Sequence, residues 1–138
     1  MPQDNETAVY DLVKISPDGQ HIVDLNCKGE YSMANFWYSI IVDGKAIEGR
    51  EVVDSCIWSS DSRYFAVTEI PEGEYPQDGR FNVLLFDFER KRFSLITHPE
   101  DKGIRPVRFD GNNLICQTWR DSAEWSFAIT TLQGWQPL

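Results

Sequence analysis

The sequence predicts an all-β domain made of three antiparallel sheet units. Short runs of alternating apolar and polar residues are separated by turns rich in Gly, Pro and Asp, which is typical of strands joined by tight turns. Aromatic residues make up 13% of the chain, and they favour strands. One pattern, an apolar residue followed by a polar turn and a second strand, occurs three times. A chain of 138 residues is expected to form a single domain over residues 1–138.

The clearest copy of this pattern covers residues 52–70, where two strands flank the polar turn Ser59-Ser60-Asp61-Ser62. Asp43-Gly44 is a strong two-residue hairpin signal in the preceding part of the chain. A loop is expected at residues 27–30 because it contains a glycine. The strands that we expect over the whole chain are 8–15, 21–25, 36–42, 45–53, 52–58, 63–70, 81–88, 92–97, 105–109, 114–119 and 125–132.

Each copy of the pattern has an apolar anchor immediately before its turn. The anchors are Ile15, Trp58 and Phe109, which lie 43 and 51 residues apart. The chain therefore divides into units at roughly 8–51, 52–103 and 104–138. A period in the forties with about four strands per unit is typical of propeller blades.

The turn sequences also resemble a known family. Ile15-Ser-Pro-Asp-Gly and Trp58-Ser-Ser-Asp-Ser are similar to the blade motif of TolB-type and related WD-like β-propellers, in which such a turn precedes a buried strand. The third copy, Phe109-Asp-Gly-Asn-Asn, keeps the shape without the Ser-Pro. The resemblance implies a propeller-like fold with a binding surface, and it implies no activity.

Three units are fewer than the four to eight blades that close a propeller. We therefore expect an open or sandwich-like stack, or a half-propeller completed by a second chain, and a monomer or a homodimer. In residues 81–88, Phe81, Val83 and Leu85 form one apolar face, and Leu84, Phe86 and Phe88 form the other. This strand should be covered on both sides.

The charge of the chain bears on its partners. Thirteen basic and 22 acidic residues give a formal net charge of −9, which disfavours nucleic acid and suits a protein with a basic surface. The only dense basic cluster, Arg90-Lys91-Arg92, lies at an expected hairpin turn. Acidity that serves solubility alone is the simpler explanation. The polar N-terminus and the lack of a long apolar run predict a cytoplasmic protein without membrane contact.

Residues suited to catalysis or metal binding are few. The two histidines, His21 and His98, are far apart, and no zinc, phosphate-loop or nucleophile motif occurs, so we expect no catalytic site, metal or cofactor. Cys56 and Cys116 fit buried core positions, whereas Cys27 is expected to be exposed. The remaining candidates are turn acids, for which capping of the turn backbone is the simpler role: Asp18, Asp43, Asp61 and Asp110.

The most promising binding segment is the long loop that follows the second unit's central strand. Its candidate partner-binding residues are Glu69, Glu72, Glu74, Tyr75 and Asp78. A tyrosine among carboxylates can anchor in a pocket while the acids meet Lys or Arg. A solvated insertion is the alternative. Four tryptophans raise the question of a ligand platform, but core packing fits them better, except for an exposed Trp135: Trp37, Trp119, Trp125 and Trp135.

These observations favour a non-catalytic protein-binding module. One concrete version is an acidic inhibitor or immunity-type protein that masks a basic partner such as a nuclease toxin. The alternatives are a divergent propeller-like domain that binds or hydrolyses a ligand through tryptophans and paired carboxylates, and a structural subunit of a larger assembly.

Overall fold

The computed structural model describes residues 10–71 and 79–138, and it contains strands, turns and one short 3-10 helix there. The all-β prediction is confirmed. In chain order the elements are β1 (Leu12–Ile15), β2 (Ile22–Ser32), β3 (Asn35–Val42), β4 (Lys45–Trp58), β5 (Tyr64–Ile70), β6 (Asn82–Asp87), β7 (Arg92–Ile96), β8 (Ile104–Asp110), β9 (Asn113–Thr118), β10 (Glu124–Ala128), η1 (Ile129–Thr131) and β11 (Gln136–Pro137).

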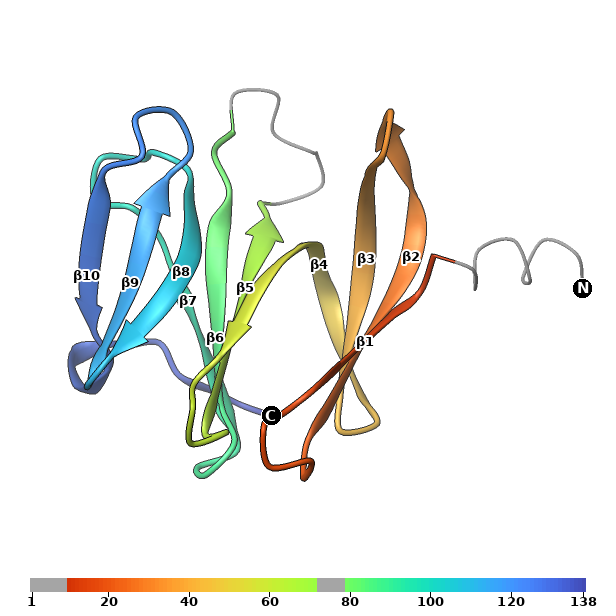
Figure 1. The fold of residues 1–138 in the computed structure, drawn as a ribbon, viewed down its shortest axis with the longest axis horizontal. Coiled ribbons are helices and arrows are strands. Elements are labelled where there is room, and N and C mark those ends of the chain that lie inside the picture. Colours follow the sequence, from red (N-terminus) through yellow and green to blue (C-terminus); the bar gives the residue numbers. More distant parts are fainter. Residues whose placement is uncertain (1–9, 72–78) are drawn as a thin grey trace, which may run out of the picture.

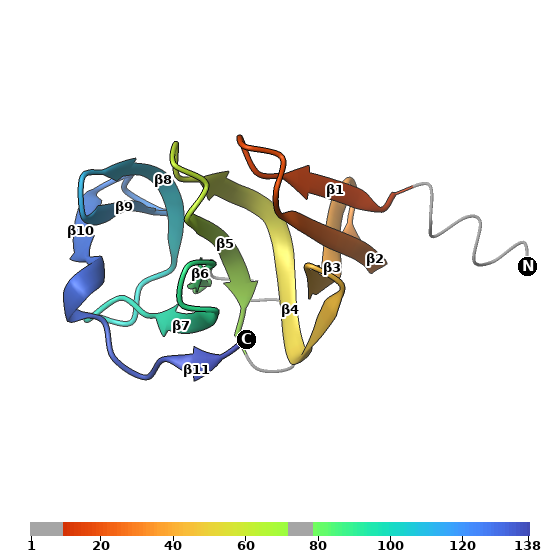
Figure 2. The ribbon, with the colours of Figure 1, turned by 90° about the horizontal axis from the view of Figure 1, so that it is seen from below.

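The strands form two antiparallel sheets, and neither closes on itself within the described part of the chain. The larger sheet has the order β1-β2-β3-β4-β5-β6-β7-β11, and the smaller has the order β10-β9-β8. In Figure 1 the strands lie in groups side by side along the long axis, with β8–β10 beyond β5–β7. Figure 2 shows the larger sheet curving, so that β1–β3 and β5–β7 lie on either side of β4.

The strand β4 joins two segments that the sequence suggested were separate strands, 45–53 and 52–58. It runs without interruption from Lys45 to Trp58 and crosses the expected unit boundary. Its first part pairs with β3 and its second part with β5, with a register shift between Val52 and Cys56. A bulge of this kind bends a strand, which allows β4 to pair with β3 along one part and with β5 along the other.

Two of the other differences from the expected boundaries have a clear local cause. The expected loop at 27–30 belongs to β2, because Gly29 lies against the Trp37 indole on β3, where a Cβ atom would come within 2.6 Å of the ring. The glycine therefore makes room for an aromatic side chain and does not end the strand. The expected strand 125–132 ends at Ala128, since the Ile129 amide donates to the Asn112 carbonyl at 2.9 Å and η1 begins there.

The prediction of a strand buried on both faces is confirmed at β6. Leu84 and Phe86 lie in the apolar core enclosed by the curved eight-stranded sheet. Val83 and Leu85 lie in a second core, which β5–β7 share with the three-stranded sheet. All four side chains are fully buried. The strand β6 therefore packs against both cores and connects them.

The β1–β2 turn and the β4–β5 turn share the same hydrogen bonds. The Ser16 hydroxyl donates to Asp18 Oδ1 at 2.7 Å and accepts from the His21 amide at 3.0 Å. The Ser59 hydroxyl likewise donates to Asp61 Oδ1 at 2.6 Å, and it accepts from the Tyr64 amide at 2.9 Å. These turn acids thus have the structural role that the sequence predicted.

Candidate functional site

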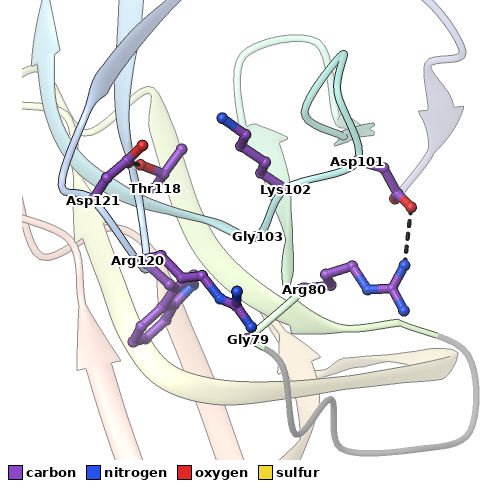
Figure 3. Close-up of a pocket in the computed structure, with 9 residues that line it drawn as sticks. Gly79, Arg80, Asp101, Lys102, Gly103, Thr118, Arg120 and Asp121 are labelled. Carbon is purple, nitrogen blue, oxygen red and sulfur yellow. Dashed lines mark hydrogen bonds and ion pairs between the residues drawn. The ribbon is translucent and has the colours of Figure 1, made fainter.

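Three segments meet at one end of the molecule, at the top of Figure 1: residues 79–81, 97–103 and 119–123. They surround a cavity of about 430 Å³, which we call the loop-end pocket (Figure 3). Six of its nine described lining residues carry polar or charged side chains. Its residues are Gly79, Arg80, Asp101, Lys102, Gly103, Thr118, Trp119, Arg120 and Asp121.

Backbone contacts hold the loops of this pocket together. Gly103 lies so close to Gly79 that a Cβ atom added at Gly103 would come within 1.5 Å of the Gly79 carbonyl oxygen. The Ile104 amide donates to the Phe81 carbonyl at 3.0 Å, and the Trp119 amide donates to the Gly103 carbonyl at 3.2 Å. Only glycine fits at position 103, and the floor of the pocket depends on it.

The charges of the pocket are mixed. Arg80 binds Asp101 across the rim at 3.1 Å, and both side chains are exposed to solvent (Figure 3). Asp121 accepts hydrogen bonds from the Thr118 hydroxyl and from a backbone amide, and these bonds lower the pKa of its carboxyl. Arg120 makes no ion pair with any described residue. Among the described residues, the pocket therefore offers the Arg120 guanidinium without an ion pair, beside acids that are already engaged.

Trp119 is the central side chain at this end of the molecule. Its side chain is 39% exposed, and its indole Nε1–H donates to the Ile104 carbonyl at 3.2 Å. The Phe81 ring packs at 5.0 Å, and the Arg105 guanidinium lies 5.6 Å from the centre of the indole. These contacts fix the orientation of an exposed aromatic ring, so little side-chain entropy is lost when a partner covers it.

Trp119 also lines a second cavity, of about 530 Å³, on the side of β3 and β4. Five of its eleven described lining residues are aromatic, and its polar groups include a carboxylate. We call it the aromatic cavity and define it by the rings of Tyr10, Phe36, Tyr38, Phe81 and Trp119 and by the carboxylate of Asp54. One fixed tryptophan thus separates a charged pocket from an aromatic one.

The structure places one of the five predicted partner-binding residues. Glu69 lies on β5 with its side chain buried, and its Oε2 accepts from Arg50 Nη1 at 2.7 Å. A partner could reach this carboxylate only by displacing Arg50. The other four candidates lie outside the described residues, and their role stays a prediction: Glu72, Glu74, Tyr75 and Asp78.

The cysteines do not form an exposed reactive site. Cys27 is buried in β2, so the expectation that it is exposed is wrong, because that segment is a strand and not a loop. Burial raises the pKa of Cys56 to about 11 and that of Cys116 to about 12, which keeps both thiols protonated near neutral pH.

The histidines are engaged within the fold. His21 binds the Asp43 carboxylate at 2.8 Å, and buried His98 accepts from the Glu100 amide at 2.9 Å. No cluster of three or more His, Cys, Asp or Glu side chains suited to a metal occurs among residues 10–71 and 79–138.

The sequence named Trp119 only as one of four tryptophans for which core packing was the preferred interpretation, and the structure leaves this ring exposed. Trp135, which we expected to be exposed, is half-buried, with the Arg92 guanidinium 3.9 Å from its ring centre. Trp119 is the more exposed of the two. The available signal was its position between the end of a strand and the polar connection 120–124.

Comparison of the chain with protein-family models, curated proteins and solved structures returned no match. Within the described residues, no helix has the length and apolar character that crossing a bilayer requires.

Proposed function

We propose that the protein is a non-catalytic protein-binding module that uses its loop end. The observation that supports this best is Trp119, an exposed ring with a fixed orientation beside Gly79 and Phe81. Tryptophan and arginine dominate binding energy at interfaces when they are fixed and central. Trp119 lies next to Arg105 and Arg120, so the described part of the loop end has this composition.

The proposed partner is a protein with a basic surface. The net charge of −9 attracts such a partner over long distances and increases the association rate. In this proposal Glu72, Glu74 and Asp78 meet Lys or Arg side chains, and Tyr75 inserts between them. An inhibitor or immunity-type protein that masks a basic toxin is the concrete version, because masking requires a complementary surface and no chemistry of its own.

We further propose that the scaffold is an open relative of the propellers, with three blade-like units. The matching turn hydrogen bonds of Ser16 and Ser59 support this, as does the hydrogen bond that joins the two turns, from the Asp18 amide to the Ser62 hydroxyl at 2.9 Å. In such a scaffold the loops at one end of the strands converge, and rigid strands hold them in place.

Affinity capture with a matched variant tests the function. The wild-type chain is immobilised beside a variant with Glu72→Gln, Glu74→Gln, Asp78→Asn and Tyr75→Ser, and bound proteins are identified over a series of salt concentrations. We expect the wild type to enrich basic proteins, the variant to lose them, and salt to weaken capture. Equal capture by both chains, or capture that ignores ionic strength, would contradict the proposal.

A further inference from the structure

The aromatic cavity has the composition of a site for a cation. Its rings come from four separate parts of the fold: the start of β1, β3, the start of β6 and the end of β9 (Figure 1). Tyr10 stacks on Phe36 with ring centres 4.8 Å apart, and Phe81 packs against Trp119. The faces of aromatic rings carry negative charge density, which attracts Lys, Arg and other cations.

The carboxylate of the cavity has an unused oxygen. Both contacts of Asp54 within the described chain use Oδ1: Lys14 Nζ lies at 2.9 Å and the Cys56 thiol at 3.9 Å. Oδ2 has no hydrogen-bond or ion-pair partner among the described residues, and the Asp54 side chain is 42% exposed. A second cation can therefore bind to Asp54 without displacing the first.

No Lys or Arg side chain from the described residues lines this cavity, in contrast to the loop-end pocket. Asp54 is the only charged group in its described lining, so the cavity favours a cation and disfavours an anion. Tyr38 stays neutral, because burial and the nearby Asp54 raise the pKa of its phenol. The cavity is large enough for one long side chain.

We propose that the aromatic cavity binds an arginine side chain of the partner, with its guanidinium between the rings and on Asp54 Oδ2. This rests on the proposed function, since it names the group by which the basic partner is anchored. A planar guanidinium stacks on aromatic faces and is weakly hydrated, so it fits better than the ammonium of lysine. The chain itself places arginines over rings at Tyr64 and Trp135.

Titration with a small probe, followed by two-dimensional NMR spectroscopy, tests this. The probe is N-acetyl-arginine amide, and the control is the neutral isostere N-acetyl-citrulline amide. We expect the arginine probe to shift the Trp119 indole signal and the Tyr38 and Ser55 amides, and the citrulline probe to bind more weakly. Equal binding of the two probes, or shifts confined to other regions, would overturn the assignment.

Three variants of the full chain sharpen the test. Asp54→Asn should weaken the arginine probe about two- to fivefold, the range for a partly exposed ion pair, and leave the citrulline probe unchanged. Lys14→Gln should tighten the arginine probe because it frees the whole carboxylate, an effect that a purely structural role would not produce. Asp110→Asn, at the opposite end of β8, is the matched control and should bind as the wild type does. Wild-type affinity in Asp54→Asn would refute the role of this carboxylate.

This experiment and the capture experiment can fail separately. Arginine binding that depends on Asp54, without capture of any basic protein, would retain the cavity assignment and refute the proposed function. Capture that depends on the acidic loop, without arginine binding, would retain the function and refute the cavity.

Discussion

Asp87 is the buried charge on which we expect the stability of the strands β5–β7 to depend. Its carboxylate, fully enclosed at the end of β6, accepts from Arg63 Nε at 3.1 Å and from Arg92 Nε at 3.2 Å. The backbone amides of Glu89 and Arg90 donate to the same carboxylate at 3.2 and 3.3 Å. Burial acts to raise the pKa of Asp87, but the bonds from Arg63, Arg90 and Arg92 outweigh it and lower the pKa.

Asp87→Asn keeps the shape of the side chain but removes the charge and turns an amide donor toward two guanidinium donors. Breaking a fully buried ion pair costs about 3–5 kcal/mol. The Arg63 and Arg92 side chains are 28% and 27% exposed, so water can solvate them once the carboxylate is gone. We therefore expect a loss of about 2–3 kcal/mol, out of a total of roughly 5–15 kcal/mol.

Urea denaturation followed by circular dichroism measures this loss, and thermal unfolding should show a Tm lower by roughly 6–15 °C. Asp110→Asn is the control. Its exposed side chain predicts a change within about 0.5 kcal/mol. An Asp87→Asn protein with the wild-type urea midpoint would refute the assignment of Asp87 as a structural charge.

The other predictions concern packing and pH. The buried Thr68 hydroxyl has no hydrogen-bond partner among the described residues, so Thr68→Val should stabilise the fold by about 1 kcal/mol and raise the urea midpoint. Gly103→Ala should lower it and shift the Trp119 indole NMR signal, because the new methyl group collides with the Gly79 carbonyl. Hydrogen bonds also lower the pKa values of Asp18 and Asp61 from the usual 3.8, so the stability that these carboxylates contribute should be present above that pH and should be lost as the pH falls through the lowered values. Constant urea midpoints across that range would contradict these shifts.

Much of the fold could be predicted because its determinants are local. The alternation of apolar residues located most strands. The two apolar faces of residues 81–88 predicted that this strand is covered on both sides, although the sequence did not show which elements cover it. The Ser and Asp residues of the turns predicted their own hydrogen bonds, since these link residues only two to five positions apart.

The rest depends on partners that are distant in the sequence. From the sequence, Gly29 predicts a loop, because its contact with Trp37 on the neighbouring strand is not visible there. Glu69 likewise looks like an exposed acid, because only the pairing of β4 with β5 brings Arg50 to it. The exposure of Trp119 depends on where three loops meet. The binding role that we propose for Asp54 depends on aromatic rings that four separate parts of the fold bring around it.

Hydrogen exchange on the chain, alone and in complex with a captured basic protein, tests the partner-binding surface most directly. We predict slower exchange in residues 79–81, 97–103 and 119–123 and at Asp54 and Ser55, with no change in the turns at the opposite end of the strands. Protection of the opposite turns or of the outer face of β8–β10, with the loop end unchanged, would contradict it.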